Sequence, residues 1–403
     1  MLERRQTMYE FIVIILASWA LFTVKTTFKE VVLLLLTTAL LVWGMKLAKQ
    51  YEIKIVRYVL LLVTVSMVLA YSYGAIVNIP ITLLAGSGMF LGMYIIGKSR
   101  VYQWKIVGLI SVCLIPTLLI CTRIFGEPVK NTESYISIGP FFTLAWILLL
   151  LPFALGFFLR NEIALPWCKN SISVNHLLMI CWMAVNAYIS GVINSEYGTA
   201  MIICGTATVM FFIYGKYWIA KGVFCLLAVG AVTKVLEMSL KARIRLAIFQ
   251  DAREALQMYA KETEPVIRIL DTAPLYGLWG LGHGSFQAET AINDYAISCL
   301  LMNYGIMFTV LVVSVLVIFI VKICLIKPRD SKDRILVEIY GVMLFVMAFL
   351  GIAGPMNSFV LTGVGIPFLS ISGSMNSCLI GGLGMVVALK EKGEAAYEKK
   401  LFG

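Results

Sequence analysis

Charged residues are scarce in this sequence. They make up 14% of the 403 residues, whereas apolar residues make up 60% and the mean hydropathy is +0.91. Soluble domains carry about a quarter charged residues, so the composition excludes an ordinary water-soluble protein. The sequence has only two histidines, no paired CxxC spacing among its nine cysteines, and no Walker, HExxH or GxSxG pattern. It therefore offers none of the usual zinc, P-loop or hydrolase motifs of soluble enzymes.

The sequence consists mainly of long apolar runs. A membrane-spanning helix needs about 20 mostly apolar residues, because the backbone finds no water to bond in the bilayer. The sequence predicts an all-α, polytopic transmembrane bundle of about 12 spans. The first run is interpreted as a retained anchor, since no small-residue cleavage site follows it. The predicted spans are residues 10–24, 30–48, 55–73, 79–97, 106–122, 141–159, 173–193, 197–214, 218–237, 292–321, 334–353 and 374–390.

Lysine and arginine gather in alternate short loops. Cytoplasmic loops of membrane proteins carry this excess, so both termini are predicted to be cytoplasmic. The loops at 74–78, 194–196 and 354–373, which hold no Lys or Arg, are predicted to be outside. The net charge of +11 is then a signal of topology, and no basic stretch interleaved with aromatics points to nucleic acid. The predicted inner loops contain Lys46, Lys49, Lys54, Lys98, Arg100, Lys105, Arg160, Lys169, Lys216, Lys221, Lys327, Arg329, Lys332 and Arg334.

One predicted outer loop, residues 238–291, is too long to be a simple connector. Loops of this length are usually functional. Apolar residues recur at helical spacing over residues 239–261. This pattern predicts a single helix that lies on the outer leaflet, or else a soluble cap helix.

Short polar or glycine-rich stretches on the predicted outer face resemble those of a known family. Residues 362–374, TGVGIPFLSISGS, resemble the TG-x-x-LPF-[IV]-S-Y-GGS signature of the SEDS family (FtsW, RodA, SpoVE), the membrane glycosyltransferases of bacterial cell-wall assembly. Five further stretches follow the family's order. Residues 135–141, 195–200, 242–246, 277–282 and 293–297 are similar to its RWI-x-LGPF, PDLGTA, basic RI, GGLFGxGLG and HTDFIF segments.

The resemblance covers about residues 106–390. It implies a SEDS-like core over residues 106–403, preceded by additional transmembrane helices over residues 1–105. Some positions depart from the family pattern, which implies a divergent member. Tyr135 stands in place of a tryptophan, Glu196 in place of an aspartate and Ser372 in place of a glycine, and the family's PSEL segment is absent.

The family resemblance implies polymerisation of lipid II at the outer face of the bacterial plasma membrane, for cell division, elongation or sporulation. Asp294 matches the family's essential aspartate, and such a reaction needs a carboxylate near the acceptor hydroxyl. The alternative is that Asn293 or Asp294 only caps the helix that follows. The resemblance also implies a class B penicillin-binding protein as partner.

Other residues are candidates for holding the substrate. Glu196 begins a span on the outer face and could contact the substrate or a Mg²⁺ ion, or it could be only a helix-start charge. Arg243 and Arg245 suit a diphosphate, because guanidinium groups match phosphate oxygens, although a solvated or headgroup-binding role is open. His283 and Glu289 are secondary candidates. The resemblance further implies substrate contacts at Tyr135, Thr362, Gly363, Pro367, Ser370 and Ser374.

Two other functions remain open at the level of sequence. A flippase for lipid-linked precursors would need an inner gate and polar residues at mid-membrane depth, whereas the polar stretches here cluster on one face. A non-catalytic scaffold for a transpeptidase is compatible with the departures from the family pattern. Formation of glycan strands from lipid II separates the enzyme from both alternatives.

Overall fold

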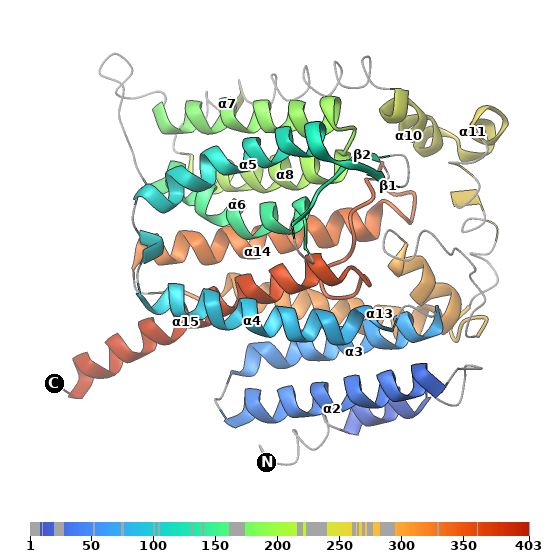
Figure 1. Ribbon diagram of the computed structural model, residues 1–403, viewed down its shortest axis with the longest axis horizontal. Helices are drawn as coiled ribbons and strands as arrows, with labels where there is room; N and C mark the ends of the chain where they lie inside the picture. The colour runs from blue at the N-terminus through green and yellow to red at the C-terminus, as the bar shows by residue number, and fades with distance from the viewer. Residues whose placement is uncertain are drawn as a thin grey trace.

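Ten apolar helices, each long enough to cross a membrane, form the body of the described chain. In this computed structural model they run side by side along the long axis of the molecule (Figure 1). The protein is therefore a multi-pass membrane protein. The structure describes residues 9, 11–19, 28–50, 53–73, 76–99, 101–103, 105–129, 132–138, 141–160, 174–215, 221–222, 240–259, 263, 266–267, 271, 277–282, 295–328, 330–360 and 362–402.

The elements follow one another as long helices with few strands. Two short hairpins, β1–β2 and β3–β4, are antiparallel and lie between α5 and α6. The bounds are α2 Phe28–Gln50, α3 Lys54–Ser72, α4 Asn78–Ser99, a 3₁₀ turn Val101–Gln103, α5 Lys105–Phe125, β1 Glu127–Val129, β2 Thr132–Tyr135, β3 Ser137–Ile138, β4 Phe141–Phe142, α6 Thr143–Arg160, α7 Val174–Tyr188, a π-helical turn Ile189–Ile193, α8 Tyr197–Tyr214, α10 Leu240–Gln250, α11 Ala252–Met258, α13 Ala296–Cys324, α14 Ser331–Ala353 and α15 Gly373–Phe402.

The predicted helical bundle is confirmed, and ten of the twelve predicted spans coincide with apolar helices. Within the predicted span 10–24, the structure describes residues 11–19, which are helical. Of the predicted span 218–237, the structure describes only residues 221–222. The division at residue 105 stays a prediction.

The two ends of the bundle differ in character. One end, here called the inner end, gathers Lys98, Lys322 and Lys392 with other basic residues of the predicted inner loops. The opposite end, called the outer end, holds hairpin β1–β2 and helices α10 and α11 (Figure 1). The grouping of loops predicted from charge is thus reproduced, while the orientation of the ends in the membrane stays a prediction.

Helices α4 and α15 pack so closely that glycine is required between them. A Cβ added to Gly384 would lie 2.2 Å from the Phe90 carbonyl oxygen, and one added to Gly97 would lie 2.6 Å from the Ala388 side chain. The Ser377 hydroxyl also donates to the Thr82 carbonyl at 3.2 Å. Small residues of this kind let membrane helices gain dispersion contacts that hydrocarbon does not supply.

A buried polar cluster ties the inner end together. The Tyr102 hydroxyl donates to Asp333 Oδ1 at 2.6 Å, and Gln103 Nε2 donates to the same oxygen at 3.1 Å. Lys392 Nζ donates to the Tyr102 hydroxyl at 3.2 Å, while Arg160 Nε donates to a backbone carbonyl of α14 at 3.0 Å. Burial is the largest cause that raises the pKa of Tyr102, followed by its bond to Asp333, so the phenol stays a donor. The cluster joins four segments of the chain, namely the turn 101–103 and the helices α6, α14 and α15.

Over residues 240–258 the long outer loop contains two helices where one was predicted. Helix α10 ends at Gln250, and Asp251 then caps α11 by accepting from the backbone N–H groups of Arg253 at 2.9 Å and Glu254 at 3.1 Å. The prediction of a single helix over 239–261 is therefore wrong. Aspartate is favoured at the start of a helix, because its carboxylate accepts hydrogen bonds from the first backbone N–H groups, which have no partner within the helix.

Candidate functional site

The site begins with two turns that meet at the outer end. Gly198, in the first turn of α8, lies against the backbone of residues 362–364, since an added Cβ would be 3.1 Å from the Thr362 carbonyl oxygen and 3.0 Å from a Val364 methyl group. A side chain at this position would force its neighbours to shift by a few tenths of an ångström, so glycine favours this approach. Two of the family-like stretches, residues 195–200 and 362–374, are thereby in direct contact.

The turn that precedes α8 is fixed by its own backbone. The Glu196 N–H donates to the Ser190 carbonyl at 2.8 Å, and the Ser190 hydroxyl donates back to the Glu196 carbonyl at 2.9 Å. Ser195 has a φ of 54°, in the left-handed region that non-glycine residues rarely adopt. Glu196 is half-buried, and its side chain makes no capping hydrogen bond to α8. The helix-start position is therefore occupied without the usual side-chain cap.

Helix α10 places one of the two candidate arginines beside this turn. The Arg245 guanidinium carbon lies 5.5 Å from the centroid of the Tyr197 ring. Tyr197 is the residue that follows Glu196 in the chain. Arg243, two residues earlier on α10, is exposed. Arg245 is therefore the one of the two arginines that lies beside the turn before α8.

The residues of the 362–374 stretch lie inside the bundle. Thr362, Pro367, Ser370 and Ser374 are buried, and Gly363 has a φ of 72°. Asn376, on the first turns of α15, accepts from the Phe368 N–H at 2.9 Å and donates to the Ser370 carbonyl at 2.6 Å. The stretch is therefore a tightly held structural loop, and most of these residues shape the site through their backbone.

Two buried hydroxyls at the contact between the turns have no hydrogen-bond partner among the described residues. They are Thr362 Oγ1 and Thr199 Oγ1, and each belongs to a residue that is at most 6% exposed. A third, Ser298 Oγ, lies near the start of α13. A buried hydroxyl without a partner costs roughly 1–3 kcal/mol, so each favours a ligand or water at this end.

Other predicted residues fall outside the part of the chain that the structure describes. Asp294, His283 and Glu289 are among these, and for Tyr135 only the backbone is described, at the end of β2. The chain resumes at Tyr295, which is 5% exposed and precedes the buried first turns of α13.

A polar contact between α3 and α13 escaped the sequence analysis. Asn303 Nδ2 donates to the Tyr73 hydroxyl at 2.9 Å, and the hydroxyls of Ser72 and Tyr304 share a hydrogen bond of 3.2 Å. A single Asn within an apolar run was the only available signal, because the partners are more than 200 residues apart in the chain.

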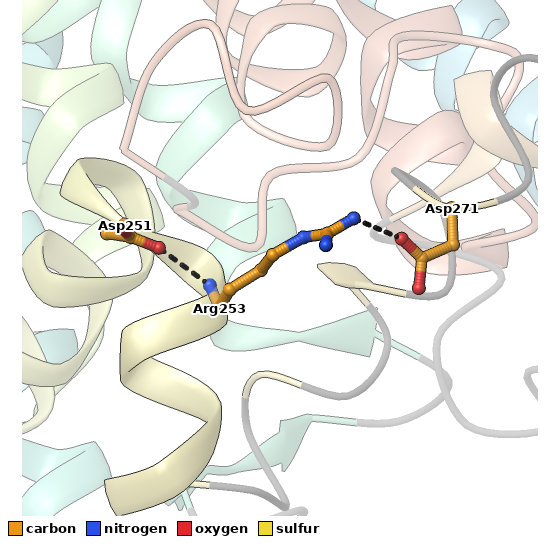
Figure 2. Close-up of polar contacts among 3 residues, drawn as sticks. All are labelled: Asp251, Arg253 and Asp271. Atoms are coloured by element: carbon orange, nitrogen blue, oxygen red, sulfur yellow. Dashed lines mark hydrogen bonds and ion pairs between the residues drawn. The ribbon is translucent and has the colours of Figure 1, made fainter.

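One exposed charge pair lies on helix α11 at the outer end. Arg253, beside the capping carboxylate of Asp251, reaches across to Asp271 at 3.0 Å and joins α11 to a later part of the long loop (Figure 2). Both side chains are more than half exposed, so the pair contributes little to stability. The described residues contain no group of three or more His, Cys, Asp or Glu side chains that could hold a metal ion.

The structure of the chain is similar to solved structures, whereas its sequence matches no family model and no curated protein. A chain of a peptidoglycan synthase complex that coordinates polymerization and crosslinking matches with a TM-score of 0.67 and 18% identity, over 84% of this chain and 96% of that chain. The rod shape determining protein RodA of Thermus thermophilus matches with a TM-score of 0.59 and 16% identity, over 84% of this chain and 96% of RodA.

The chain has the RodA fold. A mutant of the same Thermus protein gives a similar result, with a TM-score of 0.60 and 15% identity over 84% of this chain and 97% of that chain. The RodA fold is the one that the sequence resemblance implies. The structural match extends over nearly the whole of RodA. Part of this chain lies outside the match.

Proposed function

We propose that the chain is a divergent SEDS-type peptidoglycan glycosyltransferase, which polymerises lipid II into glycan strands at the outer face of the bacterial plasma membrane. The observation that carries the proposal is the contact between the 195–200 and 362–374 stretches at one end of a RodA-like bundle. Two motifs separated by more than 150 residues meet where the proposed chemistry needs them. The predicted topology places this end outside.

The reaction transfers a glycan from one lipid-linked unit to another. The 4-hydroxyl of one GlcNAc attacks the anomeric carbon of MurNAc in a second unit, the bond from that carbon to the diphosphate oxygen breaks, and undecaprenyl diphosphate leaves. Asp294 takes the proton from the attacking hydroxyl, as a positioned carboxylate does in general base catalysis. Its support is its match in sequence and its place directly before Tyr295, at the outer start of α13.

The departing diphosphate needs positive charge. Arg245 supplies it, because α10 holds its guanidinium over the Tyr197 ring next to Glu196. Arg243, exposed on the same helix, meets the diphosphate or a headgroup as it arrives. The unpartnered hydroxyls of Thr362 and Thr199 give the substrate hydrogen-bonding groups between the two turns.

The proposed cofactor is a divalent cation such as Mg²⁺. Glu196, half-buried and not used as a helix cap, would hold Mg²⁺ together with the diphosphate oxygens, since Mg²⁺ is commonly bound by one or two carboxylates plus phosphate. When bound, the ion would neutralise charge on the leaving group. The other site residues do not depend on it.

The proposed partner is a class B penicillin-binding protein. The support is the likeness to a chain of a complex that coordinates polymerization and crosslinking, which are two successive steps on the same glycan. A transpeptidase bound beside the outer end would receive each strand as it forms. In the predicted topology both termini are cytoplasmic, on the opposite side of the membrane from the glycan product.

The test is formation of glycan strands from lipid II by the purified chain, with and without such a transpeptidase. We expect the purified chain to form long glycan strands that a muramidase digests. Lipid II that crosses the bilayer without polymerising would indicate a flippase, and activity that comes only from the partner would indicate a scaffold.

A further inference from the structure

Helix α13 is broken at Gly305, and a distant turn repairs the break. Gly305 has a φ of 78° and a ψ of 179°, which interrupts the helical hydrogen bonds. The turn formed by residues 277–282, here called the glycine turn, satisfies the groups that the break frees. The Leu281 N–H donates to the Met302 carbonyl at 2.7 Å, and the N–H groups of Ile306 and Met307 donate to the carbonyls of Gly277 at 3.1 Å and Leu278 at 3.3 Å.

Steric contact fixes the position of the glycine turn. A Cβ added to Gly280 would lie 2.6 Å from the Asn303 carbonyl oxygen, and one added to Gly305 would lie 2.3 Å from the Leu278 carbonyl oxygen. Both neighbours are backbone atoms, which cannot rotate away. The turn therefore sits at one defined level along α13.

The glycine turn presents apolar side chains outward. Trp279 is 79% exposed, Leu278 is 56% exposed and Leu281 is 43% exposed. Three large apolar side chains within four residues are unusual at a water-facing surface, because each exposed apolar area costs free energy in proportion to its size.

The helix below the break gives the depth of this turn. The run of roughly 18 residues from Ile306 to Ile323 is about 27 Å long at 1.5 Å per residue, close to the hydrocarbon thickness of about 30 Å. Met307 and Leu311 on this run are more than half exposed, as lipid-facing residues are. At the other end, Lys322 Nζ lies 5.1 Å from the Tyr58 ring centroid, in the pairing expected at the inner boundary. The break therefore coincides with the outer boundary.

A second tryptophan lies at the same level. The ring of Trp19 is 5.1 Å from that of Tyr304, the residue immediately before the break. Tryptophans gather where hydrocarbon meets headgroups, because their rings are apolar and their N–H groups are polar.

We propose that the glycine turn is a membrane anchor: Leu278, Trp279 and Leu281 insert into the boundary between headgroups and acyl chains of the outer leaflet. The occupant of this surface is lipid, because the turn is hydrogen-bonded to the first residues of a helix whose large apolar side chains are exposed, and the turn exposes large apolar side chains of its own. The anchor holds the break in α13 at a constant depth.

The experiment uses the full chain reconstituted in phosphatidylcholine vesicles. The fluorescence of Trp279 is obtained as the difference between the parent and Trp279→Phe, a variant whose fold should be intact because the side chain is largely exposed. Quenching is measured with lipids brominated near the headgroup, with lipids brominated near the acyl-chain ends, and with acrylamide in water. Trp43→Phe is the matched control, since Trp43 is 60% exposed but lies well inside α2.

We expect the Trp279 signal to be quenched most by bromine near the headgroup and the Trp43 signal most by deeper bromine. Strong quenching of Trp279 by acrylamide with little by either lipid would overturn the anchor. So would protection from acrylamide that appears only when a transpeptidase is added, because the surface would then belong to a protein partner. Trp279→Tyr, measured in the same way, checks that the difference signal does not depend on the replacement.

Discussion

Asn376 holds the backbone of Phe368 in place, with its Oδ1 accepting from the Phe368 N–H at 2.9 Å. Phe368 needs this support, because its φ of 63° is in the left-handed region and costs roughly 1–2 kcal/mol for a bulky residue. The ring of Phe319 packs edge-on against it at 5.5 Å. The most family-like stretch of the sequence is thus held by a residue just beyond that stretch.

The first prediction concerns this clamp. Asn376→Ala leaves the Phe368 N–H without its bond to the amide in a buried loop, at a cost of roughly 1–3 kcal/mol. It also removes the amide bond to the Ser370 carbonyl, which keeps its bond from the Ser66 hydroxyl at 3.3 Å. We expect a clear fall in thermal stability in detergent, with loss of activity even at temperatures where the variant stays folded. Ser358→Ala, at an exposed position in the same connection, should leave both unchanged. Parental activity in Asn376→Ala would show that the loop does not need the clamp.

The second prediction concerns the contact between α4 and α15. Gly384→Ala places a methyl group against the Phe90 backbone, so we expect a loss of about 1–3 kcal/mol, typical of overpacking. The control is Gly88→Ala on α4, where no atom lies within 4 Å of the added Cβ. That variant should be neutral or slightly stabilising, since alanine favours a helix more than glycine does. Similar melting temperatures for the two variants would contradict the packing.

Topology gives the third prediction. A cysteine that replaces the exposed Ser358 should react with a membrane-impermeant maleimide in whole cells, whereas one that replaces the exposed Lys327 should react only after lysis. The parent chain provides the background from its own cysteines. The reverse labelling would place the candidate site in the cytoplasm and remove the basis of the proposed function.

Much of the bundle was predictable from sequence, because each span is a local property of one apolar run. The break at Asp251 had a local signal, an aspartate within a helical pattern, but the apolar spacing concealed it. The Gly305 break and its repair by residues 277–282 had no such signal, since the bonds join backbone groups more than 20 residues apart.

The candidate site was predictable only in part. The resemblance identified the stretches that meet at Gly198 and residues 362–364. The substrate contacts that it implies at residues such as Ser370 stay predictions. Asn376 and the Asn303–Tyr73 pair were missed because the value of a polar side chain in a membrane helix depends on partners that only the fold brings near.

The fourth prediction concerns Glu196. If Glu196 holds Mg²⁺ with the diphosphate, Glu196→Gln should weaken polymerisation in a way that added Mg²⁺ partly restores. Glu254→Gln, at an exposed position on α11, is the matched control and should behave as the parent at every Mg²⁺ concentration. Equal activity of Glu196→Gln and the parent throughout would assign Glu196 to the start of α8 alone.

The most direct test replaces Asp294 by asparagine and follows glycan strand formation from lipid II. Asparagine keeps the size and the helix-capping ability of aspartate, so a capping role predicts a change of only a few tenths of a kcal/mol in stability and normal activity. Loss of a general base typically costs about 10²–10⁴-fold in rate. Asp271→Asn, which removes an exposed carboxylate from the same loop, controls for charge and should polymerise normally. We predict that Asp294→Asn folds, reaches the membrane and binds its transpeptidase but forms no strands; polymerisation at the parental rate would contradict the account.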